Sequence, residues 1–359
     1  MSAAPLRLLV DIGHPAHVHL FRNAMRIWLD RGHHVVITIR DKDLTARLLD
    51  LYGFSYTVAS TARRGTSGLA LELLEHDWNV LQVARCNKSQ LLLGTSVSIT
   101  HAARLLKGAR SIVFNEDDAN VARTFTRLAY PLAHAIVTPA CLNENHGSKH
   151  IKYDGYQKLA YLHPNVFTPN PEMLSRLGVR IGERYFLIRL VSLQAAHDKG
   201  QNGLDPASRR RLVQMLSKHG RVFITSEFPL PEEFEPYRMA ISPTDIHDIL
   251  YYATLFIGDS QSMTVEAAVL GTPAIRCNTF AGRISVLQEL EHKYGLTYSF
   301  LPAQEELMFA RIQELLNKAN LREEWQQKRA RMLADKIDVT AWMVDFVERY
   351  AENLLERRL

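Results

Sequence analysis

Cysteine is scarce in this chain. The 359 residues include three cysteines, Cys86, Cys141 and Cys277, which lie far apart and form no C-x-x-C pair. Neither a disulfide framework nor a cysteine zinc site is therefore indicated, and we expect a reducing, cytoplasmic environment. Residues 1–9 lack the pattern of a signal peptide, and no apolar run approaches the ~20 residues that a membrane span requires.

Several common catalytic and nucleotide-binding motifs are also missing. The sequence contains neither the G-x-G-x-x-G fingerprint nor a Walker A motif. The segment 258–262 (GDSQS) lacks the closing glycine of the G-x-S-x-G elbow, which excludes a serine hydrolase of that type. No repeat of ~20–50 residues is visible, so a solenoid is not expected.

The composition is that of a globular protein. Hydrophobic residues account for 47% of the chain and charged residues for 23%, which excludes a disordered chain. The length of 359 residues exceeds the ~250–300 at which one hydrophobic core stops growing, so we expect two domains. The formal charge of +5 is compatible with nucleic acid, an anionic membrane face or a polyanionic small substrate, and charge alone does not choose among them.

Short apolar runs alternate with helical patterns throughout the first half. The run 7–12, for example, is followed by Val18, Phe21 and Met25 at helical spacing. Strands that are apolar on both faces belong to parallel sheets covered by helices, so we expect a doubly wound α/β domain. The expected strands are 7–12, 35–40, 55–58, 90–93, 111–114 and 135–138, and the expected helices are 16–31, 43–52, 69–85, 99–106 and 119–130.

A second domain of the same kind is expected in the other half. Between residues 146 and 171 the periodicity lapses into glycine, proline and asparagine, which indicates the interdomain linker. We expect domains at 1–165 and 166–338, followed by a C-terminal helix in 339–359 that can pack back on the first domain. The second half should contain strands at 185–191, 221–226, 255–258 and 273–277, and helices at 206–219, 247–252, 262–270, 321–335 and 340–354.

The most informative segment is 255–268 (LFIGDSQSMTVEAA), in which a buried strand ends at Gly258 and hydroxyl residues open a helix. Free N–H groups and the positive helix end make phosphate the natural ligand. Ser262 and Glu266 share one helix face, which places a carboxylate beside the phosphate at a distance suited to ribose hydroxyls. Alternatively, Ser260 or Ser262 only caps the helix and Glu266 is an exposed helical residue.

Three histidines lie in the segment 10–19 (VDIGHPAHVH), after the first expected strand. Ligands of α/β proteins gather at the carboxyl ends of strands, so His14 is a candidate general base or phosphate ligand. His17 and His19 lie two apart on an expected helix and point to opposite sides, so no metal site is indicated. Each histidine can instead merely form hydrogen bonds with the loop backbone.

Two further polar segments follow expected strands. Residues 113–119 (VFNEDDA) place three acids at the expected start of a helix, where the dipole favours acids in any case, and one of them can serve as a base or acid. The segment 189–200 supplies Arg189, His197 and Lys199, whose positive charge suits a diphosphate. A purely structural role of this loop stays open.

Four segments together resemble the uncharacterised family termed domain of unknown function 354. They are 10–19 (VDIGHPAHVH), 114–118 (FNEDD), 154–162 (DGYQKLAYL) and 258–273 (GDSQSMTVEAAVLGTP). That family is a relative of GT-B glycosyltransferases and of the non-hydrolysing UDP-N-acetylglucosamine 2-epimerases. The resemblance, from residue 8 to about 282, implies a GT-B fold in which two Rossmann-like domains face a cleft and the C-terminal domain holds the nucleotide.

The resemblance also implies roles for individual residues. The epimerases carry a D-S-G-G-x-x-x-E segment that holds phosphate and ribose. In this chain the corresponding phosphate contacts are Ser260, Gln261 and Ser262. The corresponding ribose ligand is Glu266. Both glycines are replaced here, so side chains can take the place of close backbone contact. The H-R-R-E-N-type loop is matched only at His197, and the H-V-E-A-G glutamate is matched loosely at Glu116, which favours glycosyl transfer over epimerisation.

We therefore expect a glycosyltransferase that uses a nucleotide-activated sugar, a UDP-sugar first, in cell-surface or exported glycan synthesis. The helix at Ser262 and the cations of 189–199 stabilise the diphosphate leaving group. His14 or Glu116 deprotonates the hydroxyl of an acceptor that the sequence does not identify. No cofactor or metal is expected, because the positive helix end can substitute for one.

Two alternatives stay open at this point. The first is a 2-epimerase or a nucleotide-sugar hydrolase on the same fold. The second is a non-catalytic nucleotide-sugar or nucleic-acid binding protein, although no nucleic-acid partner is expected. A peripheral contact with an anionic inner membrane face is compatible with the positive charge.

Overall fold

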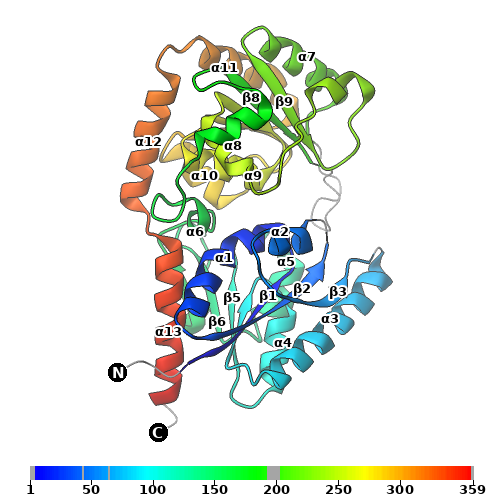
Figure 1. The fold of residues 1–359 in the computed structure, drawn as a ribbon, viewed down its shortest axis with the longest axis vertical. Helices are drawn as coiled ribbons and strands as arrows, with labels where there is room; N and C mark the ends of the chain where they lie inside the picture. The colour runs from blue at the N-terminus through cyan, green and yellow to red at the C-terminus, as the bar shows by residue number, and fades with distance from the viewer. Residues whose placement is uncertain (1–4, 43, 64, 192–202, 357–359) are drawn as a thin grey trace. The chain divides into compact units, whose positions relative to one another are not determined.

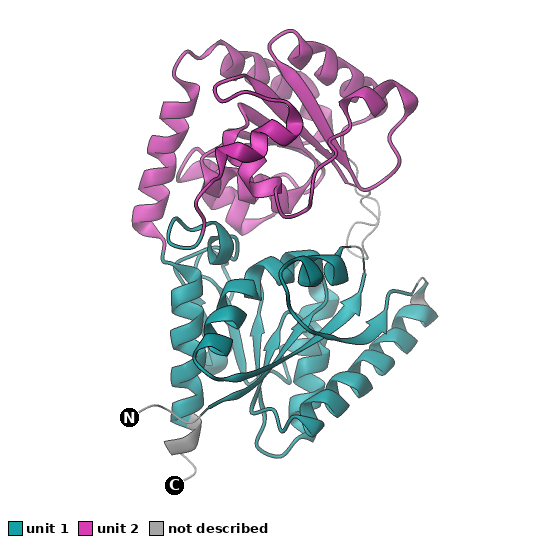
Figure 2. Ribbon diagram, viewed as in Figure 1, with its two compact units in different colours: residues 1–166, 337–359 teal, residues 167–336 magenta. Residues whose placement is uncertain are grey.

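The computed structural model describes residues 5–42, 44–63, 65–191 and 203–356. These residues form two compact units: unit 1 comprises residues 1–166 and 337–359, and unit 2 comprises residues 167–336 (Figure 2). Each unit is built on its own parallel sheet. Among the described residues, no helix combines the length and the apolar character that crossing a membrane requires.

Unit 1 contains a seven-stranded sheet in the order β3-β2-β1-β4-β5-β6-β7. Its strands are β1 (Arg7–Ile12), β2 (His34–Asp41), β3 (Thr57–Thr61), β4 (Leu91–Gly94), β5 (Arg110–Phe114), β6 (Ala135–Pro139) and β7 (His150–Tyr153). All pairs are parallel. The chain leaves β1 on one side for β2 and β3 and returns on the other side with β4, so the topological switch point lies between β1 and β4.

Helices cover both faces of this sheet, which is why its central strands are mostly apolar. The helices are α1 (Pro15–Asp30), α2 (Thr45–Leu51), α3 (Thr66–Cys86), α4 (Ser98–Leu105), α5 (Arg123–Ala129), α6 (Leu159–Leu162) and α13 (Val339–Glu356). Helix α1 packs with α2, α6 and α13, whereas α3 packs with α4 and α4 packs with α5 (Figure 1). On the α3 side, Leu9, Leu92 and Val113 from three strands are fully buried.

The C-terminal helix α13 belongs to unit 1. The Oγ1 of Thr340 donates a hydrogen bond to the carbonyl oxygen of Ala160 at 2.5 Å, and the ring of Trp342 stacks on Tyr153 with centroids 4.9 Å apart. A Cβ added to Gly155 would lie 2.7 Å from Cγ2 of Val339. The absence of a side chain at this glycine therefore allows α13 to approach the end of β7 closely.

Unit 2 contains a five-stranded parallel sheet in the order β12-β11-β10-β8-β9. Its strands are β8 (Tyr185–Leu190), β9 (Arg221–Ser226), β10 (Leu255–Gly258), β11 (Ala274–Cys277) and β12 (Thr297–Phe300). Its helices are α7 (Pro206–Ser217), α8 (Ile246–Tyr252), α9 (Gln261–Leu270), α10 (Ser285–His292), α11 (Glu305–Asn317) and α12 (Leu321–Asp335). The switch point of this sheet lies between β8 and β10.

Short 3₁₀ helices complete the described elements: η1 (Gly147–Lys149), η2 (Pro171–Leu177), η3 (Glu232–Tyr237) and η4 (Pro302–Gln304). Helix α9 is largely buried, because every residue from Thr264 to Leu270 is buried. It packs with α8, α10 and α12, and it ends at Gly271, whose φ of 74° is the left-handed conformation that favours glycine.

Several element boundaries differ from those expected from sequence. Strands β7 and β12 were not expected, and β7 lies inside the irregular stretch 146–171. Four-residue strands give little periodicity, and pairing with β6 or β11 supplies the stability instead. The helix expected over 119–130 begins only at Arg123, because residues 117–122 form turns. The three acids of 116–118 therefore lie in a loop and not at a helix start.

Candidate functional site

Each sheet has a glycine at its switch point that brings two strands together. In unit 1, a Cβ on Gly94 of β4 would lie 2.6 Å from the carbonyl oxygen of Asp11 on β1. In unit 2, a Cβ on Gly258 of β10 would lie 2.4 Å from the carbonyl oxygen of Arg189 on β8. The carboxyl ends of strands at a switch point form the usual ligand crevice of an open α/β sheet. Both crevices are therefore candidate sites.

In unit 2, helix α9 starts directly beyond the switch point. Ser260 is its N-cap residue, and its Oγ accepts a hydrogen bond from the backbone N of Met263 at 3.3 Å. Gln261 and Ser262 form the first turn, where backbone N–H groups and the positive end of the helix dipole favour an anion. The capping alternative is thus correct for Ser260, and capping keeps the helix start in place beside the crevice.

Glu266 lies on the same helix and is only 6% exposed. It is therefore not the exposed helical residue of the alternative interpretation. Its Oε1 lies 3.5 Å from Nε2 of His247, a residue of α8 that is 2% exposed. A buried carboxylate beside a buried imidazole is held in a defined orientation, which a ligand for vicinal hydroxyls requires. Sequence patterns did not identify His247, because its partner belongs to another helix.

Within the part of the chain that the structure describes, three buried polar atoms at the carboxyl ends of β8, β9 and β10 have no hydrogen-bond partner. They are Nε of Arg189, Oγ1 of Thr225 and Oδ2 of Asp259. Arg189 is paired in register with both Thr225 and Gly258, so the three groups flank one point of the sheet edge. Buried polar groups without partners are rare in native proteins and call for an explanation, such as a ligand that is bound in the functional state.

Two charged side chains at this edge, those of Arg189 and Asp259, have different partners. The guanidinium of Arg189 contacts Oε1 of Glu227 at 2.7 Å, and Glu227 is 41% exposed. Oδ1 of Asp259 accepts a hydrogen bond from the backbone N of Val191 at 2.7 Å. Burial raises the pKa of Asp259 to about 6, although that hydrogen bond and the charges of Arg209 and Arg189 oppose the rise. This carboxyl group can therefore be neutral under mildly acidic conditions.

In unit 1, His14 occupies the position just before α1. It is the N-cap residue of that helix, and its Nδ1 accepts a hydrogen bond from the backbone N of Ala16 at 3.2 Å, while the side chain stays exposed. Nδ1 of His17 accepts from the backbone N of Gly13 at 3.4 Å. Burial, with the nearby charges of His14 and Lys158, lowers the pKa of His17 to about 3. His17 is therefore neutral at physiological pH.

The other two sequence candidates of unit 1 have clear structural partners. Oε2 of Glu116 contacts Nζ of Lys158 at 2.7 Å, and its Oε1 accepts a hydrogen bond from the backbone N of Gln157 at 2.6 Å. Glu116 thus holds the loop before α6, and the charge of its partner Lys158 acts on His17. His19 is buried, and its ring lies 5.2 Å from that of Tyr161, so it belongs to the core and not to the crevice.

A buried network at the first switch point was not expected from sequence. Asp11 is fully buried and accepts hydrogen bonds from Oγ1 of Thr38 at 2.6 Å and from Nε2 of His76 at 3.0 Å. The other ring nitrogen of His76 lies 2.7 Å from Oγ of Ser60. Burial alone would raise the pKa of Asp11, but the charge of His76 and hydrogen bonds with His76, Ser96 and Thr38 lower it overall. Asp11 is therefore an anion.

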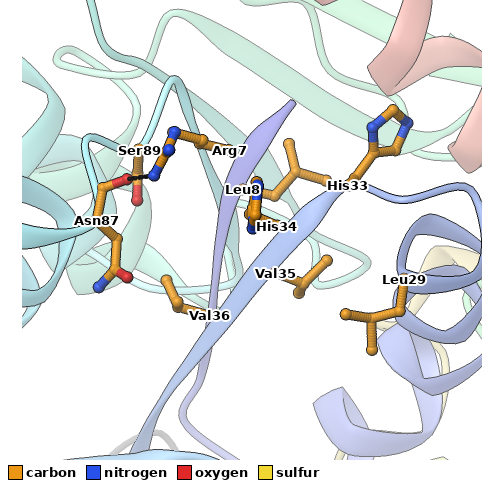
Figure 3. A pocket seen from close by; sticks show the side chains of 9 residues that line it. All are labelled: Arg7, Leu8, Leu29, His33, His34, Val35, Val36, Asn87 and Ser89. Atoms are coloured by element: carbon orange, nitrogen blue, oxygen red, sulfur yellow. Dashed lines mark hydrogen bonds between the residues drawn. The ribbon is translucent and has the colours of Figure 1, made fainter. Parts of the chain in front are cut away.

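His197 and Lys199 lie outside the described residues, so the structure assigns them no position. Of the described candidates of unit 2, Arg189 lies beside Gly258, and Ser260, Gln261 and Ser262 follow at the start of α9. Glu266 lies further along α9, against His247 of α8. A cavity of about 200 Å³ lies elsewhere, at the amino ends of β1 and β2, where Arg7, His33 and Ser89 are among its lining residues (Figure 3). Ligands of α/β sheets bind at the opposite ends of the strands, so this cavity is not the candidate site.

Comparison with known proteins adds a family and a fold. The model of the family described as "Protein of unknown function (DUF354)" matches residues 6–352. The uncharacterized protein MJ0665 of Methanocaldococcus jannaschii is 23% identical over 290 residues, which cover 76% of this chain and 82% of that protein.

Solved structures with the same architecture include glycosyltransferases and epimerases. Spinosyn forosaminyltransferase SpnP has a TM-score of 0.64 at 14% identity, covering 97% of this chain and 100% of that one. A UDP-N-acetylglucosamine 2-epimerase has a TM-score of 0.65 at 12% identity, with 97% of both chains covered. S. aureus MnaA, solved with UDP, has a TM-score of 0.67 at 9% identity, again covering 97% of both chains. The expected GT-B-like fold with two Rossmann-like units is thereby confirmed.

Proposed function

We propose that this chain, which belongs to the DUF354 family of proteins of unknown function, transfers a sugar from a nucleotide-activated donor, first of all a UDP-sugar, to an acceptor hydroxyl. The observation that carries the proposal is the set of partnerless buried polar atoms of Arg189, Thr225 and Asp259 beside the start of α9. A diphosphate supplies the acceptor oxygens that Nε of Arg189 and Oγ1 of Thr225 lack.

The donor is recognised by unit 2. The first turn of α9, at Gln261 and Ser262, faces the diphosphate, and Arg189 adds a fixed positive charge at the end of β8. Charge that develops on the leaving nucleoside diphosphate is stabilised by these groups without rearrangement. Glu266 accepts the ribose hydroxyls, with His247 holding the carboxylate in place. His197 and Lys199 follow Arg189 in the sequence and are proposed to bind the same diphosphate.

The acceptor is activated by unit 1. A base takes the proton of the acceptor hydroxyl while its oxygen bonds to the anomeric carbon and the diphosphate leaves. The candidates are His14, through the Nδ1 that now accepts from Ala16, and Glu116, now held by Lys158. Either group exchanges its present partner for the acceptor. The positive helix end of α9 stabilises the leaving group, so the proposal includes no metal or cofactor.

The proposal is tested by ligand-dependent stabilisation across a panel of nucleotide sugars and nucleoside diphosphates. A ligand at 100 times its Kd stabilises the unit that binds it by ~2.7 kcal/mol, which a thermal shift detects. Glu266→Ala should weaken nucleotide-sugar binding by about tenfold to a hundredfold, because a buried hydrogen-bonded charge is lost. Glu323→Ala, at an exposed position of α12, is the matched control and should bind normally. Silence across the whole panel would refute the proposal.

A second candidate is epimerisation or hydrolysis of the nucleotide sugar, which the similarity to UDP-N-acetylglucosamine 2-epimerase structures favours. The two reactions differ in their need for an acceptor. An epimerase or hydrolase converts the bound nucleotide sugar alone, so an epimer or free nucleoside diphosphate accumulates. A glycosyltransferase forms product only when an acceptor is added, and proton NMR of the sugar separates these outcomes.

A further inference from the structure

Helix α3 exposes a row of large apolar side chains. Leu71 is 57% exposed, Leu74 is 66% exposed and Trp78 is 60% exposed. Their spacing of three and four residues places them on one face of the helix. The opposite face is also apolar, since Val80 and Ala84 are fully buried against the sheet. A surface helix of a globular unit is normally polar on its outer side, so this outer face needs a partner.

The charges of α3 leave this face without net negative charge. Its three acids all have cationic or imidazole partners: Glu72 contacts Arg40, Glu75 contacts Arg63, and Asp77 contacts Nδ1 of His101 at 2.6 Å. At the carboxyl end of the helix, Arg85 and Lys88 are exposed. The apolar row is thus followed by cations along the same helix.

Exposed apolar and cationic residues are also found at the end of the neighbouring helix, α4. Helix α4 packs beside α3 (Figure 1). Its last residue, Leu105, is 72% exposed, and Lys107, two residues further on, is exposed too. Chain direction places the carboxyl ends of both helices at the amino edge of the parallel sheet, so Arg85, Lys88 and Lys107 lie at one end of the surface. We call Leu71, Leu74, Trp78, Arg85, Lys88, Leu105 and Lys107 the α3–α4 surface.

We propose that the α3–α4 surface binds an anionic lipid bilayer, with α3 lying in the plane of the interface. Leucine and tryptophan side chains enter the boundary between headgroups and acyl chains, and tryptophan is enriched at that depth. Arginine and lysine at the end of the surface contact lipid phosphates, and the contact strengthens with the negative charge of the membrane. This inference is independent of the reaction that the protein catalyses.

A second copy of the chain fits this surface less well. An aromatic side chain buries about 150–250 Å² when fully covered. Leu71, Leu74 and Trp78 together therefore fall short of the roughly 800 Å² that each partner of a stable complex buries. The cations at one end would also repel their counterparts in any pairing that brings the same ends together. A lipid surface has neither restriction.

The test uses the full chain with vesicles of phosphatidylcholine alone or mixed with phosphatidylglycerol. We expect co-sedimentation with the mixed vesicles, weakened by salt, and little with phosphatidylcholine alone. The double variant Leu71→Ser/Leu74→Ser should lose at least tenfold in vesicle affinity at unchanged thermal stability. Ile181→Ser is the matched control, because Ile181 is 74% exposed in unit 2, and it should bind like the unsubstituted chain.

Trp78 reports the depth of binding directly. Trp28 and Trp325 are fully buried and Trp342 is half-buried, so the quenching is measured in a Trp342→Phe background, in which Trp78 is the exposed tryptophan. Brominated acyl chains should quench this fluorescence, and Trp78→Phe should bind while losing the quenching. Failure of the chain to sediment with either vesicle would overturn the proposal. So would unchanged binding of the double variant, binding without quenching, or a dimer in solution that the double variant converts to a monomer.

Discussion

Asp11 and Arg189 occupy the same place in two sheets and carry opposite charges. Each is the second-last residue of the first strand of its unit, β1 or β8. Each is paired with the glycine across the switch point, Asp11 with Gly94 and Arg189 with Gly258. Their other neighbour in the register is a threonine in both sheets. The two sites therefore share a backbone frame, and only the side chains distinguish them.

The two sites differ in whether their buried polar atoms have hydrogen-bond partners. Asp11 has hydrogen bonds from Thr38 and His76. At the equivalent place in unit 2, Oγ1 of Thr225 and Nε of Arg189 have no hydrogen-bond partner among the described residues. A satisfied buried network stabilises a fold, whereas an unsatisfied one is costly unless a ligand completes it. The buried network of unit 1 therefore holds structure, whereas the unpaired polar groups of unit 2 form a candidate anion site.

The largest expected effect is the difference in stability between the Asp11→Ala and Arg189→Ala variants. Asp11→Ala should destabilise unit 1 by about 3–5 kcal/mol, because it leaves His76 buried without its counterion. Arg189→Ala should change stability by less than about 1 kcal/mol, since its ion-pair partner Glu227 is 41% exposed. It should instead lower nucleotide-sugar affinity by at least about tenfold. Thermal unfolding and calorimetric titration measure the two effects, and equal destabilisation by both variants would break the comparison.

The next effect concerns Asp259, whose pKa is raised from 3.8 to about 6 by burial. Between these pH values the unfolded chain releases this proton while the folded chain keeps it, so stability falls as the pH rises through the window. Asp259→Asn removes this pH-dependent loss of stability, because asparagine does not titrate. Its side-chain oxygen still accepts the hydrogen bond from the Val191 N–H. We expect it to stabilise unit 2 at pH 8 by up to about 3 kcal/mol and to have little effect at pH 4.

Ligand binding provides an independent check on Asp259. An anionic diphosphate beside this carboxylate should bind more tightly as the pH falls through about 6. A nucleotide sugar is the suitable probe, because its diphosphate carries no terminal phosphate proton with a pKa near 6. The pH dependence should vanish in Asp259→Asn. Its persistence in that variant would show that another group titrates.

The smallest effect compares the two threonines. Thr38→Val removes the hydrogen bond to the buried Asp11 and should cost unit 1 about 1–3 kcal/mol. Thr225→Val should leave stability within about 0.5 kcal/mol, because the Thr225 hydroxyl has no partner to lose. Urea unfolding followed for each unit compares the pair. A large cost at Thr225 would indicate that this hydroxyl is already satisfied and would weaken the case for a ligand there.

Much of the fold could be predicted from sequence, because apolar runs and helical spacing are local signals. The run 7–12 coincides with β1, and the end of a strand at Gly258 is where β10 ends. Strands β7 and β12 were missed because they are short and their formation depends on a neighbour in the sheet. Helices α6, α10 and α11 were missed as well. The late start of α5 likewise depends on the turns that precede it.

The candidate site was predictable in part. The helix start at Ser260 and the histidine at position 14 could be identified because capping and strand ends leave local patterns. His76 and His247 could not, since each acts on a residue of a different element. The ion pair of Glu116 with Lys158 was also invisible, because the two residues lie 42 positions apart.

The sequence alone determined that the chain forms alternating strands and helices, that hydroxyl residues open the helix after β10, and that a charge sits near the end of each first strand. These features depend on residues within a few positions of each other. Only the tertiary structure decided that Asp11 finds His76, 65 positions away, whereas Arg189 and Thr225 keep unpaired atoms. Pairing of buried charges is set by which elements pack together, and that packing turns one frame into a structural network and the other into a candidate anion site.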